Sequence, residues 1–487
     1  MSLNLKKTDL LCAHTLIDGQ WVKANDGQTF PVHNPATGEV IIDVANMAQA
    51  ETEAAIRAAQ KAQNTWAAQT AKQRASILRR WFDLLLAHQE DLAIIMTAEQ
   101  GKPLAEAKAE IAYAAAYIEW FAEEAKRDYG TIIPSHRADA EILIIHQPIG
   151  VVAAITPWNF PAAMITRKAA PALAVGCTMI LKPAEQTPLS ALALAKLAQE
   201  AGVPDGVFNV VTGDARPIGK ALTDSPIVRK LSFTGSTETG RLLLGQAAPT
   251  IKKVSMELGG NAPFIVFADA DLEAAVAGAM ASKFRNTGQT CVCANRIYVQ
   301  ANIYDAFVDK LSQAVAQLKL GNGMEKGITQ GPLIDMAAVE KVKAHIKDAT
   351  NKGAQLVAGG KPHKLGHGFF EPTILTHVTA SMRVAREETF GPLAPIFSFT
   401  DEADLIAQAN ATEFGLAAYL FSRDIGRIWR VVKALEVGMV AVNSGLLSTE
   451  IAPFGGVKQS GIGREGSFMG IEDYIETKYV LMASLDK

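Results

Sequence analysis

Residues 151–182 have the sequence VVAAITPWNFPAAMITRKAAPALAVGCTMILK. An apolar, β-branched run from Val151 to Thr156 is followed by a helical pattern from Ala162 to Val175 and by a second short apolar run from Thr178 to Leu181. Apolar strands that alternate with helices are typical of βαβ units, whose parallel strands are buried on both faces. The stretch therefore predicts a parallel α/β sheet.

The alternation continues beyond this stretch. A helix is expected from Ala191 to Ala201, and strands from Phe208 to Val211 and from Lys230 to Phe233. A second alternation runs from Ala262 to about Phe399. Since a chain of 487 residues is too long for one hydrophobic core, the sequence predicts two α/β domains in series.

The flanking segments differ from the alternating part. From Ala50 to about Arg127 the chain is rich in alanine and has helical periodicity, interrupted by Gly-Lys-Pro at residues 101–103. Two further strands are expected, from Glu141 to Gln147 and from Tyr474 to Leu481. These two strands are far apart in the sequence and could pair with each other.

The composition narrows the possible partners. Apolar residues make up 49% of the chain and charged residues 20%, which is typical of a globular protein. A formal net charge of -3 gives no reason to expect nucleic acid or an anionic membrane as a partner. The long uncharged stretch from Ile142 to Thr166 is interrupted by three prolines, so it does not predict a membrane-spanning helix.

The cysteines and histidines point to free thiols and to no metal. The chain has four cysteines, and its first residues lack the apolar core of a secretory signal. We therefore expect reduced thiols and a cytoplasmic protein. The nine histidines are scattered without the spacing of metal ligands, so no metal site is expected.

Two of the cysteines are separated by one residue. The segment RNTGQTCVCANR, residues 285–296, places Cys291 and Cys293 in a glycine-containing loop before an apolar strand. A thiolate is the best nucleophile among side chains near neutral pH, so Cys291 is a candidate nucleophile. In an extended loop, residues two apart point the same way, and Cys293 could form a strained, easily reduced disulfide with it. A passive small residue at position 293 explains the sequence equally well.

Two strand-to-helix turns carry groups that suit a nucleotide. Phe233-Thr-Gly-Ser236 follows a strand and opens a helix at Ser236, where backbone N–H groups can hold a phosphate. Lys182 and Glu185 follow another strand and could hold the hydroxyl groups of a ribose. A plain turn at the first place and a solvated loop at the second explain these residues as well.

Two further groups suit acyl chemistry. Glu257 is followed by Leu-Gly-Gly, so the backbone can turn tightly while the carboxylate points into a cleft. The alternative is a Glu at the end of a helix that glycine terminates. Asn159 carries an amide N–H that can stabilise an oxyanion, although a turn-forming Asn is the simpler interpretation of this residue alone.

Seven motifs in series resemble a known superfamily. They are TPWNFP (156–161), KPAE (182–185), FTGS (233–236), ELGG (257–260), GQTC (288–291), EETFGP (387–392) and PFGG (453–456). In order and spacing they resemble the aldehyde dehydrogenase superfamily over essentially the whole chain. Within it the chain most resembles the succinate-semialdehyde dehydrogenases, in the stretches ITRK (165–168), KFRNTGQTCVC (283–293) and GIGREG (461–466).

The resemblance implies a fold with a Rossmann-like cofactor domain, an α/β catalytic domain and a small β oligomerisation arm. The cofactor domain would comprise residues 1–127 and 147–259, the catalytic domain residues 260–458, and the arm residues 128–146 and 459–487. The two distant strands predicted above would belong to the arm. A homodimer or homotetramer is expected.

The resemblance also implies a mechanism. Cys291 would add to an aldehyde to form a thiohemiacetal, with the oxyanion held by the Asn159 side chain and the Cys291 N–H. Loss of hydride to the nicotinamide would leave a thioester, and Glu257 would activate the water that hydrolyses it. Lys168 and Glu465 match positions that relay protons.

The cofactor implied by the family is NAD or NADP. Lys182 and Glu185 would contact the adenosine ribose, Ser236 the pyrophosphate, and Glu388 and Phe390 the nicotinamide ribose and ring. A carboxylate at position 185 accepts hydrogen bonds from a free 2′-hydroxyl and repels a 2′-phosphate, so NAD is expected to be preferred, with NADP possible if this Glu swings aside. The full set of expected contacts is Ile155, Thr156, Pro157, Trp158, Lys182, Ala184, Glu185, Gly213, Phe233, Thr234, Gly235, Ser236, Leu258, Glu388 and Phe390.

The substrate implied is succinate semialdehyde, oxidised to succinate. Arg167 and Arg285 match a carboxylate-binding pair, and Ser448 and Phe454 match further substrate contacts. A guanidinium group suits this role because it can bind a carboxylate through two parallel hydrogen bonds. Without the resemblance, Arg167 beside Lys168 would be interpreted as a solvated or structural cation.

Three alternatives are open. Glutarate semialdehyde is one methylene longer, and a pocket distinguishes a methylene by only about 1–3 kcal/mol, so this substrate or a broader range of aldehydes fits as well. A coenzyme-A-acylating enzyme would typically lack a base such as Glu257. A non-catalytic structural or binding protein on the same fold would be expected to lose Cys291 or Glu257, and both are present.

Overall fold

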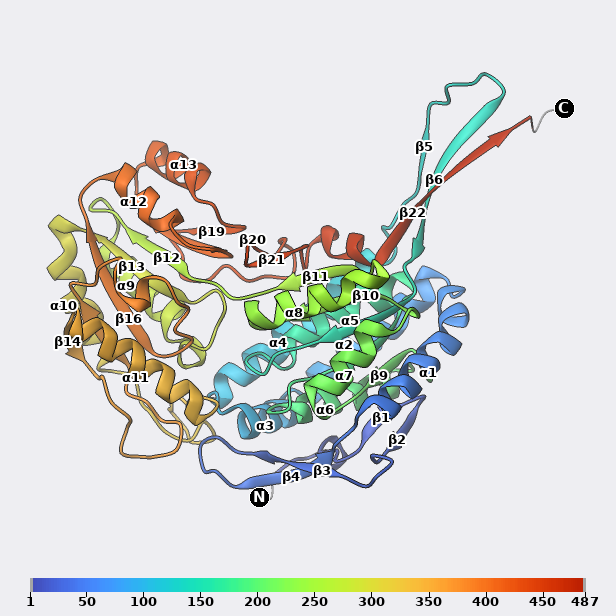
Figure 1. Ribbon diagram of the computed structural model, residues 1–487, viewed down its shortest axis with the longest axis horizontal. Helices are drawn as coiled ribbons and strands as arrows, with labels where there is room; N and C mark the ends of the chain where they lie inside the picture. The colour runs from blue at the N-terminus through green and yellow to red at the C-terminus, as the bar shows by residue number, and fades with distance from the viewer. Residues whose placement is uncertain (1–2, 485–487) are drawn as a thin grey trace.

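Two open sheets form the centres of two lobes in this computed structural model, which describes residues 3–484 (Figure 1). The sheet of the first lobe has the strand order β21 (Gly461–Ile462), β11 (Lys253–Glu257), β10 (Val228–Thr234), β7 (Val151–Ile155), β8 (Thr178–Lys182) and β9 (Phe208–Val210). β7 to β11 are parallel, and β21 joins β11 in the antiparallel direction. The parallel α/β sheet expected from residues 151–182 is confirmed.

Successive strands are added on opposite sides of β7: β8 and β9 lie on one side of it, and β10 and β11 lie on the other. Numbered in chain order, the five parallel strands lie in the order 3-2-1-4-5, which is the arrangement of doubly wound dinucleotide-binding folds. At such a reversal the loops after the two central strands separate and leave a crevice at the carboxyl edge of the sheet. Here the crevice follows Ile155 and Thr234.

Helices bury both faces of the first sheet. They are α1 (Gln49–Ala67), α2 (Ala71–Ala87), α3 (Gln89–Gln100), α4 (Leu104–Glu124), α5 (Ala163–Val175), α6 (Pro188–Glu200), α7 (Ala215–Asp224) and α8 (Thr237–Ala247). Val152 and Ala154 of β7 lie in the core formed with α2 to α6, whereas Val151 and Ala153 lie in the core formed with α1, α7 and α8. This two-sided burial explains the unbroken apolar run of β7. The predicted helical segment with a break at residues 101–103 is also confirmed.

The sheet of the second lobe has the order β14 (Gln355–Ala358), β15 (Thr373–Thr376), β16 (Leu393–Phe399), β13 (Ala294–Gln300), β12 (Ala262–Val266), β18 (Ala417–Phe421) and β19 (Met439–Val442). Around it lie α9 (Leu272–Lys283), η3 (Arg285–Gly288), α10 (Tyr304–Val315), α11 (Met336–Asn351), α12 (Glu402–Asn410) and α13 (Ile425–Ala434). The predicted end of this alternation near Phe399 is wrong. β18 pairs with β12 rather than with β16, the strand of this sheet that comes before it in the chain, and this pairing depends on tertiary contacts that sequence order does not reveal.

A long three-stranded arm projects from the first lobe (Figure 1). It is formed by β5 (Thr131–Ile133), β6 (Ala140–Pro148) and β22 (Ile475–Ala483). The predicted pairing of the two distant strands is confirmed, with Leu481 opposite Ile142.

Residues 459–474 were expected in the arm, but most of them lie against the first lobe. β21 pairs with β11, and η6 (Phe468–Tyr474) contacts α5. A Cβ on Gly461 would collide with the Met256 carbonyl oxygen, so glycine allows β21 to approach β11 this closely. The chain enters the arm only at Ile475. The three domain boundaries otherwise stay predictions, and their residues 1–2 and 485–487 lie outside the described residues.

Short strands complete the fold: β1 (Thr15–Ile17), β2 (Gln20–Val22), β3 (Thr29–His33), β4 (Val40–Ala45), β17 (Phe414–Gly415) and β20 (Val457–Lys458). Within residues 3–484, none of the helices is long and apolar enough to cross a membrane.

Candidate active site

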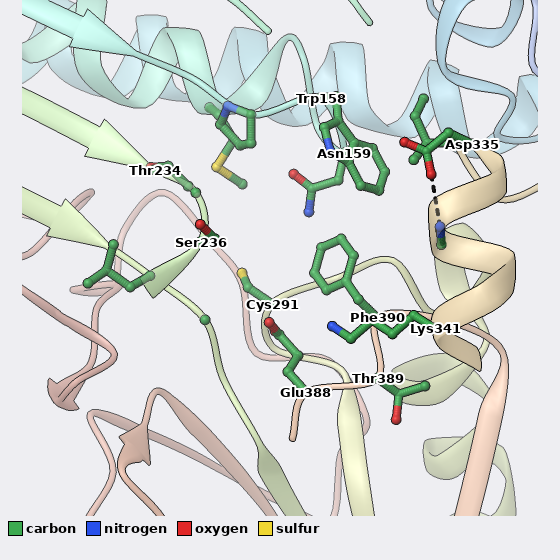
Figure 2. Close-up of a pocket in the computed structure, with 17 residues that line it drawn as sticks. Trp158, Asn159, Thr234, Ser236, Cys291, Asp335, Lys341, Glu388, Thr389 and Phe390 are labelled. Carbon is green, nitrogen blue, oxygen red and sulfur yellow. Dashed lines mark hydrogen bonds between the residues drawn. The ribbon is translucent and has the colours of Figure 1, made fainter. Parts of the chain in front are cut away.

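A cavity of about 280 Å³ opens at the crevice after β7 and β10, and we call it the crevice cavity. Its other wall belongs to the second lobe, and Figure 2 shows Asn159, Cys291, Glu388 and Phe390 around the same space. Eight of the expected cofactor residues line it: Pro157, Trp158, Thr234, Gly235, Ser236, Leu258, Glu388 and Phe390. The other seven lie in or just after the neighbouring parallel strands, toward the same sheet edge: Ile155, Thr156, Lys182, Ala184, Glu185, Gly213 and Phe233.

Cys291 lies in a turn between η3 and β13. The Cys293 N–H donates to the Thr290 carbonyl at 2.9 Å, and the Tyr419 hydroxyl donates to the Val292 carbonyl at 2.7 Å. These bonds hold the turn on both sides of the thiol. Cys291 contributes to the wall of the crevice cavity and also to that of a second cavity, so its sulfur lies where the two meet.

The surroundings of Cys291 favour the neutral form of its thiol. Burial raises the pKa of Cys291 to about 12, and the carboxylates of Glu388 and Glu257 raise it as well. The guanidinium groups of Arg167 and Arg285 act in the opposite direction and lower this pKa. A proton must therefore leave the sulfur before it can act as a nucleophile.

The structure contradicts the expectation that Cys291 and Cys293 lie in an extended loop. Residues 290–293 form a turn, and the Cys293 thiol donates to the carbonyls of Ser282 and Lys283, both at 3.1 Å. All four cysteines are free. A disulfide with Cys291 would require the turn to open, and it stays a prediction. Comparing peroxide inactivation and its reversal by a thiol reductant in the native protein and in Cys293→Ala tests it.

Asn159 presents its side-chain amide to the crevice cavity from the loop after β7 (Figure 2). Its Nδ2 donates to the Gln289 carbonyl at 3.1 Å, which fixes the orientation of the amide and uses one of its two hydrogens. The second hydrogen is free to face an oxygen bound beside Cys291. This geometry suits an oxyanion donor.

Glu257 is the last residue of β11, so the alternative of a Glu at a helix end is wrong. It is 4% exposed, and within residues 3–484 neither of its carboxylate oxygens has a hydrogen-bond partner. Burial raises its pKa well above the usual range, and the neighbouring Glu465 carboxylate raises it further. Glu257 is not among the described residues that line either cavity.

The two expected proton-relay residues lie together behind Glu257. The Lys168 ammonium contacts the Glu465 carboxylate and donates to the Thr234 hydroxyl at 2.6 Å. Lys168 is fully buried, and Glu465 is nearly so. A buried chain of acid and base groups beside a candidate base can carry protons, which is the role expected of this pair.

The second cavity, of about 240 Å³, contains the expected substrate residues, and we call it the arginine cavity. Arg167, Arg285, Ser448 and Phe454 all line it. Arg167 is 2% exposed, and its guanidinium lies 4.0 Å from the centroid of the Phe454 ring. The cavity thus combines fixed positive charge with apolar walls.

Arg167 also contacts Glu465 and two residues that the sequence did not single out, Tyr113 and Met164. It donates to the Tyr113 hydroxyl of α4, and its Nη1 lies 3.8 Å from the Met164 sulfur and 3.7 Å from Glu465. Its Nε has no partner within the described part of the chain. A buried guanidinium with one free donor is prepared to bind a carboxylate.

The residues present fit a dinucleotide at the crevice cavity. Ser236 caps α8 by accepting a hydrogen bond from the Thr239 N–H at 3.2 Å, so the first N–H groups of α8 lie at the crevice and can hold a phosphate. Lys182 Nζ and Glu185 Oε1 form an ion pair of 2.6 Å at the end of β8. These groups suit a pyrophosphate and a ribose, respectively.

Glu388 and Phe390, the residues expected to contact the nicotinamide half of the cofactor, line the crevice cavity. Glu388 accepts a hydrogen bond from the Gly260 N–H at 3.1 Å, and burial raises its pKa to about 7. Phe390 has a φ of +57°, which is uncommon for a bulky residue and indicates a functional constraint. Its ring meets Trp158 edge to face, with centroids 5.5 Å apart.

Several cavity residues were missed because they lie on helices far from any motif. α11 contributes Ala338 and Lys341 to the crevice cavity, and α4 contributes Glu106, Glu110 and Tyr113 to the arginine cavity. In an amphipathic helix, a residue that lines a cavity has the same sequence pattern as one that packs in the core. No signal in a single sequence could have identified them.

Comparison with known proteins places this geometry in a family. The protein-family model described as "Aldehyde dehydrogenase family" matches residues 21–480 of the chain. The chain belongs to the aldehyde dehydrogenase family. It is 64% identical to the glutarate-semialdehyde dehydrogenase of Pseudomonas aeruginosa, over 99% of this chain and 100% of that one.

Two further similar proteins carry a different substrate name. This aldehyde dehydrogenase is 63% identical to the succinate-semialdehyde dehydrogenase [NADP(+)] GabD of Escherichia coli, over 98% of this chain and 99% of that one. The crystal structure of succinate-semialdehyde dehydrogenase from Burkholderia pseudomallei superposes with a TM-score of 0.98 at 62% identity, covering 99% of this chain and 100% of that one. The fold expected from the seven motifs is thereby confirmed.

Across residues 3–484 of the enzyme, no group of three or more His, Cys, Asp or Glu side chains could hold a metal ion.

Proposed function

We propose that this aldehyde dehydrogenase oxidises a short aldehyde with a carboxylate at its far end, succinate semialdehyde or glutarate semialdehyde, to the dicarboxylate. The observation that carries the proposal is the position of Cys291, at the boundary between a cavity suited to a dinucleotide and a cavity lined by two arginines. A substrate whose aldehyde meets the thiol would extend its other end toward Arg167 and Arg285. The names of the most similar relatives agree with such a substrate.

The choice between the two semialdehydes depends on one methylene. A pocket distinguishes a methylene by only about 1–3 kcal/mol, so both substrates are expected to be oxidised at measurable rates. Relatives of nearly equal identity carry the two names, which supports activity on both.

The first chemical step uses residues of both lobes. The Cys291 thiol loses its proton to solvent water, and the thiolate attacks the aldehyde carbon. The new oxyanion is stabilised by the Asn159 amide and the Cys291 N–H. The residues of the crevice cavity would hold NAD(P), which would supply the hydride acceptor. Loss of hydride from this carbon would leave a thioester on Cys291. Asn159 stabilises charge that develops on the oxygen during the attack, so it stabilises the transition state more than the bound aldehyde and lowers the barrier.

The second step is hydrolysis of the thioester. Glu257 rotates toward Cys291 and takes a proton from water as the water oxygen attacks the acyl carbon. The carbon–sulfur bond then breaks, which releases the dicarboxylate and returns Cys291 as a thiolate. Because the pKa of Glu257 is raised, it is a stronger base than an exposed carboxylate once it is ionised. Lys168 and Glu465 receive the proton from Glu257 and carry it away from the thioester.

NAD is proposed as the preferred cofactor. The support is the carboxylate of Glu185, which lies at the end of β8 and pairs with Lys182. A 2′-phosphate brought near Lys182 would have to displace this carboxylate or lie beside it, at a cost in charge repulsion. A relative named for NADP(+) exists at 63% identity, so use of both cofactors is expected.

A homodimer or homotetramer is proposed as the assembly. β5 and β22 are the edge strands of the projecting arm, and Ile132 and Tyr479 on them are 72% and 56% exposed. Exposed edge strands with large apolar side chains favour association. A cytoplasmic location stays a prediction.

Steady-state kinetics on a panel of aldehydes tests the proposal. We expect kcat/KM for succinate semialdehyde and glutarate semialdehyde to exceed that for propanal by about 100-fold, since a charge-assisted carboxylate contact contributes about 1.5–3 kcal/mol. Betaine aldehyde, which carries a cation at its far end, should be oxidised more slowly still. Comparable values for all four aldehydes would show that the arginine cavity does not select the substrate.

A further inference from the structure

The Gly-Lys-Pro break between α3 and α4 brings a lysine to the base of the active site. Gly101 ends α3 with a φ of +91°, a conformation that favours glycine. Pro103 then precedes α4, and the Leu104 N–H donates to the Gly323 carbonyl of the second lobe at 2.9 Å. Lys102 is thereby placed in the interior, where it is only 2% exposed.

The Lys102 ammonium contacts the segment that carries the oxyanion donor. Its Nζ donates to the Asn159 backbone carbonyl at 2.7 Å and lies 2.5 Å from Glu110 Oε2. It also lies 4.0 Å from the centroid of the Phe160 ring, a favourable cation–π distance. One ammonium group therefore holds two consecutive residues of the loop after β7.

Glu110 holds the residues that come next. Its Oε1 accepts hydrogen bonds from the Ala162 N–H at 2.9 Å and the Ala163 N–H at 3.3 Å. These N–H groups belong to the start of α5, where a carboxylate is stabilised by the free donors and by the helix dipole. Arg167 and Lys168 lie farther along α5, so Glu110 also helps to set the position of the helix that carries them.

Asn159 is consequently held at both its backbone and its side chain. Its carbonyl accepts hydrogen bonds from Lys102 and from Asn286 Nδ2, the latter at 3.0 Å. Its amide donates one hydrogen to the Gln289 carbonyl. The hydrogen bonds to the Asn159 carbonyl fix the position of its backbone, and the hydrogen bond to the Gln289 carbonyl fixes the orientation of its side-chain amide.

A lysine–glutamate pair in this place needs a reason other than stability. Both side chains are 1% exposed, and removing two charges from water costs free energy that the attraction between them only partly returns. Burial lowers the pKa of Lys102 even though Glu110 opposes this effect. An apolar pair would fill the space, but it would make no hydrogen bonds to the Asn159 carbonyl or to the start of α5.

We propose that Lys102 and Glu110 are positioning residues, which hold the Asn159 amide and the first turn of α5 in place for the oxyanion step. The proposal rests on the proposed function, because it assigns Asn159 the role of oxyanion donor. Lys102 acts through Asn159 and touches no reacting atom.

A double-mutant cycle on kcat for succinate semialdehyde tests the proposal. Asn159→Ala alone should lower kcat about 100-fold or more, as loss of an oxyanion donor does. Lys102→Met alone should lower kcat about 10- to 100-fold, as a misplacement of about 1 Å does, with little change in KM for the cofactor. In the Asn159→Ala background, Lys102→Met should lower kcat by less than about twofold, because its effect passes through the missing amide.

Losses that multiply in the double variant would overturn the proposal, as would a loss in Lys102→Met that follows only the loss of folded protein. Glu110→Gln enters the same cycle, and it decides the outcome if Lys102→Met does not fold. If the native enzyme oxidised none of the aldehydes, the proposed function itself would fail, which is a different result from an active enzyme whose losses multiply.

Lys108→Met is the matched control. Lys108 lies on α4 and forms an ion pair of 2.6 Å with Glu90, but the two side chains are 38% and 46% exposed. An exposed pair of this kind contributes little to stability or geometry. Its removal should leave kcat unchanged within about twofold.

Discussion

The crevice cavity and the arginine cavity meet at Cys291 but are built differently. The crevice cavity lies at the ends of parallel strands, and its polar groups are loop residues, backbone N–H groups and the start of a helix. The arginine cavity lies among side chains from α4, α5 and the loops around Cys291. The first is a general feature of doubly wound sheets, whereas the second depends on individual side chains. Under the proposed function, cofactor binding is therefore tied to the fold, and substrate choice is tied to side chains that can vary without changing the fold.

Residues of the two cavities also shift the pKa of the Cys291 thiol in opposite directions. Glu388, on the crevice side, raises the pKa of Cys291, while Arg167 and Arg285, on the other side, lower it. A bound cofactor and a bound carboxylate each change this balance. The following predictions break or sharpen the comparison between the cavities, starting with the largest effect.

The largest effect is expected in the pH dependence of the rate at which the Cys291 thiol is alkylated. Because burial raises the pKa of Cys291 to about 12, only a small fraction is thiolate near neutral pH. Alkylation of Cys291 by iodoacetamide, without cofactor, should become faster by about tenfold per pH unit from about pH 6 to about pH 9. The measurement is the rate of labelling at Cys291, with Cys291→Ala as the control for the other three cysteines.

A rate that levels off below about pH 8 would show that the thiolate forms more easily than its surroundings indicate. Two variants separate the contributions of the cavities. Glu388→Gln should shift the labelling profile to lower pH, and Arg285→Ala should shift it to higher pH, since they remove charges of opposite sign.

The second effect concerns the arginine cavity alone. Arg285→Ala should raise KM for succinate semialdehyde by about 10- to 100-fold, the equivalent of about 1.5–3 kcal/mol for a lost bond to a charged group. KM for propanal and for the cofactor should stay within about twofold. Arg167→Ala should act in the same direction, but it also removes a contact to Glu465 and so affects kcat as well.

Arg57→Ala is a suitable control for these variants, because Arg57 lies on the surface of α1 with its side chain 64% exposed. Equal losses on succinate semialdehyde and propanal would refute the assignment of the arginines to the substrate carboxylate.

The smallest effect is expected outside the crevice cavity, at the end of β8. Glu185→Ser should raise kcat/KM for NADP relative to NAD by about tenfold, the equivalent of about 1.4 kcal/mol of relieved charge repulsion. Initial rates at equal, subsaturating concentrations of the two cofactors measure it. Glu53→Ser, at an exposed position on α1, should leave the ratio unchanged. A native enzyme that already prefers NADP would contradict the role given to Glu185.

Site residues in loops after strands could be predicted from the sequence, whereas those on helices could not. Cys291, Asn159 and Ser236 could be selected because each lies in a loop after a strand, where a polar residue next to glycine or proline stands out. Tyr113 and Lys341 could not, because helix positions that line a cavity resemble any other helix position. Lys102 was visible only as part of a helix break, and its contact with Asn159 joins residues 57 positions apart.

Two expectations failed because they assumed a local backbone shape. The Cys291–Cys293 segment was taken as extended, but a hydrogen bond from Cys293 to Thr290 folds it into a turn. Residues 459–474 were assigned to the arm, but β21 pairs with β11 of the first lobe. In both cases the deciding partner is a backbone group whose position does not follow from the side chains nearby.

The sequence by itself determined the two α/β sheets and the strands of the arm, and it selected Cys291 as the candidate nucleophile. Strands buried on both faces must be apolar, so their sequence pattern is visible. A cysteine in a glycine-containing loop before a strand can be recognised as a candidate nucleophile from its immediate sequence. Only the tertiary structure decided that the sulfur lies at the boundary of two cavities, that Cys293 turns away from it, and that a buried lysine–glutamate pair supports Asn159. These features depend on contacts between distant segments, whose free energy depends on distance and burial rather than on the order of residues.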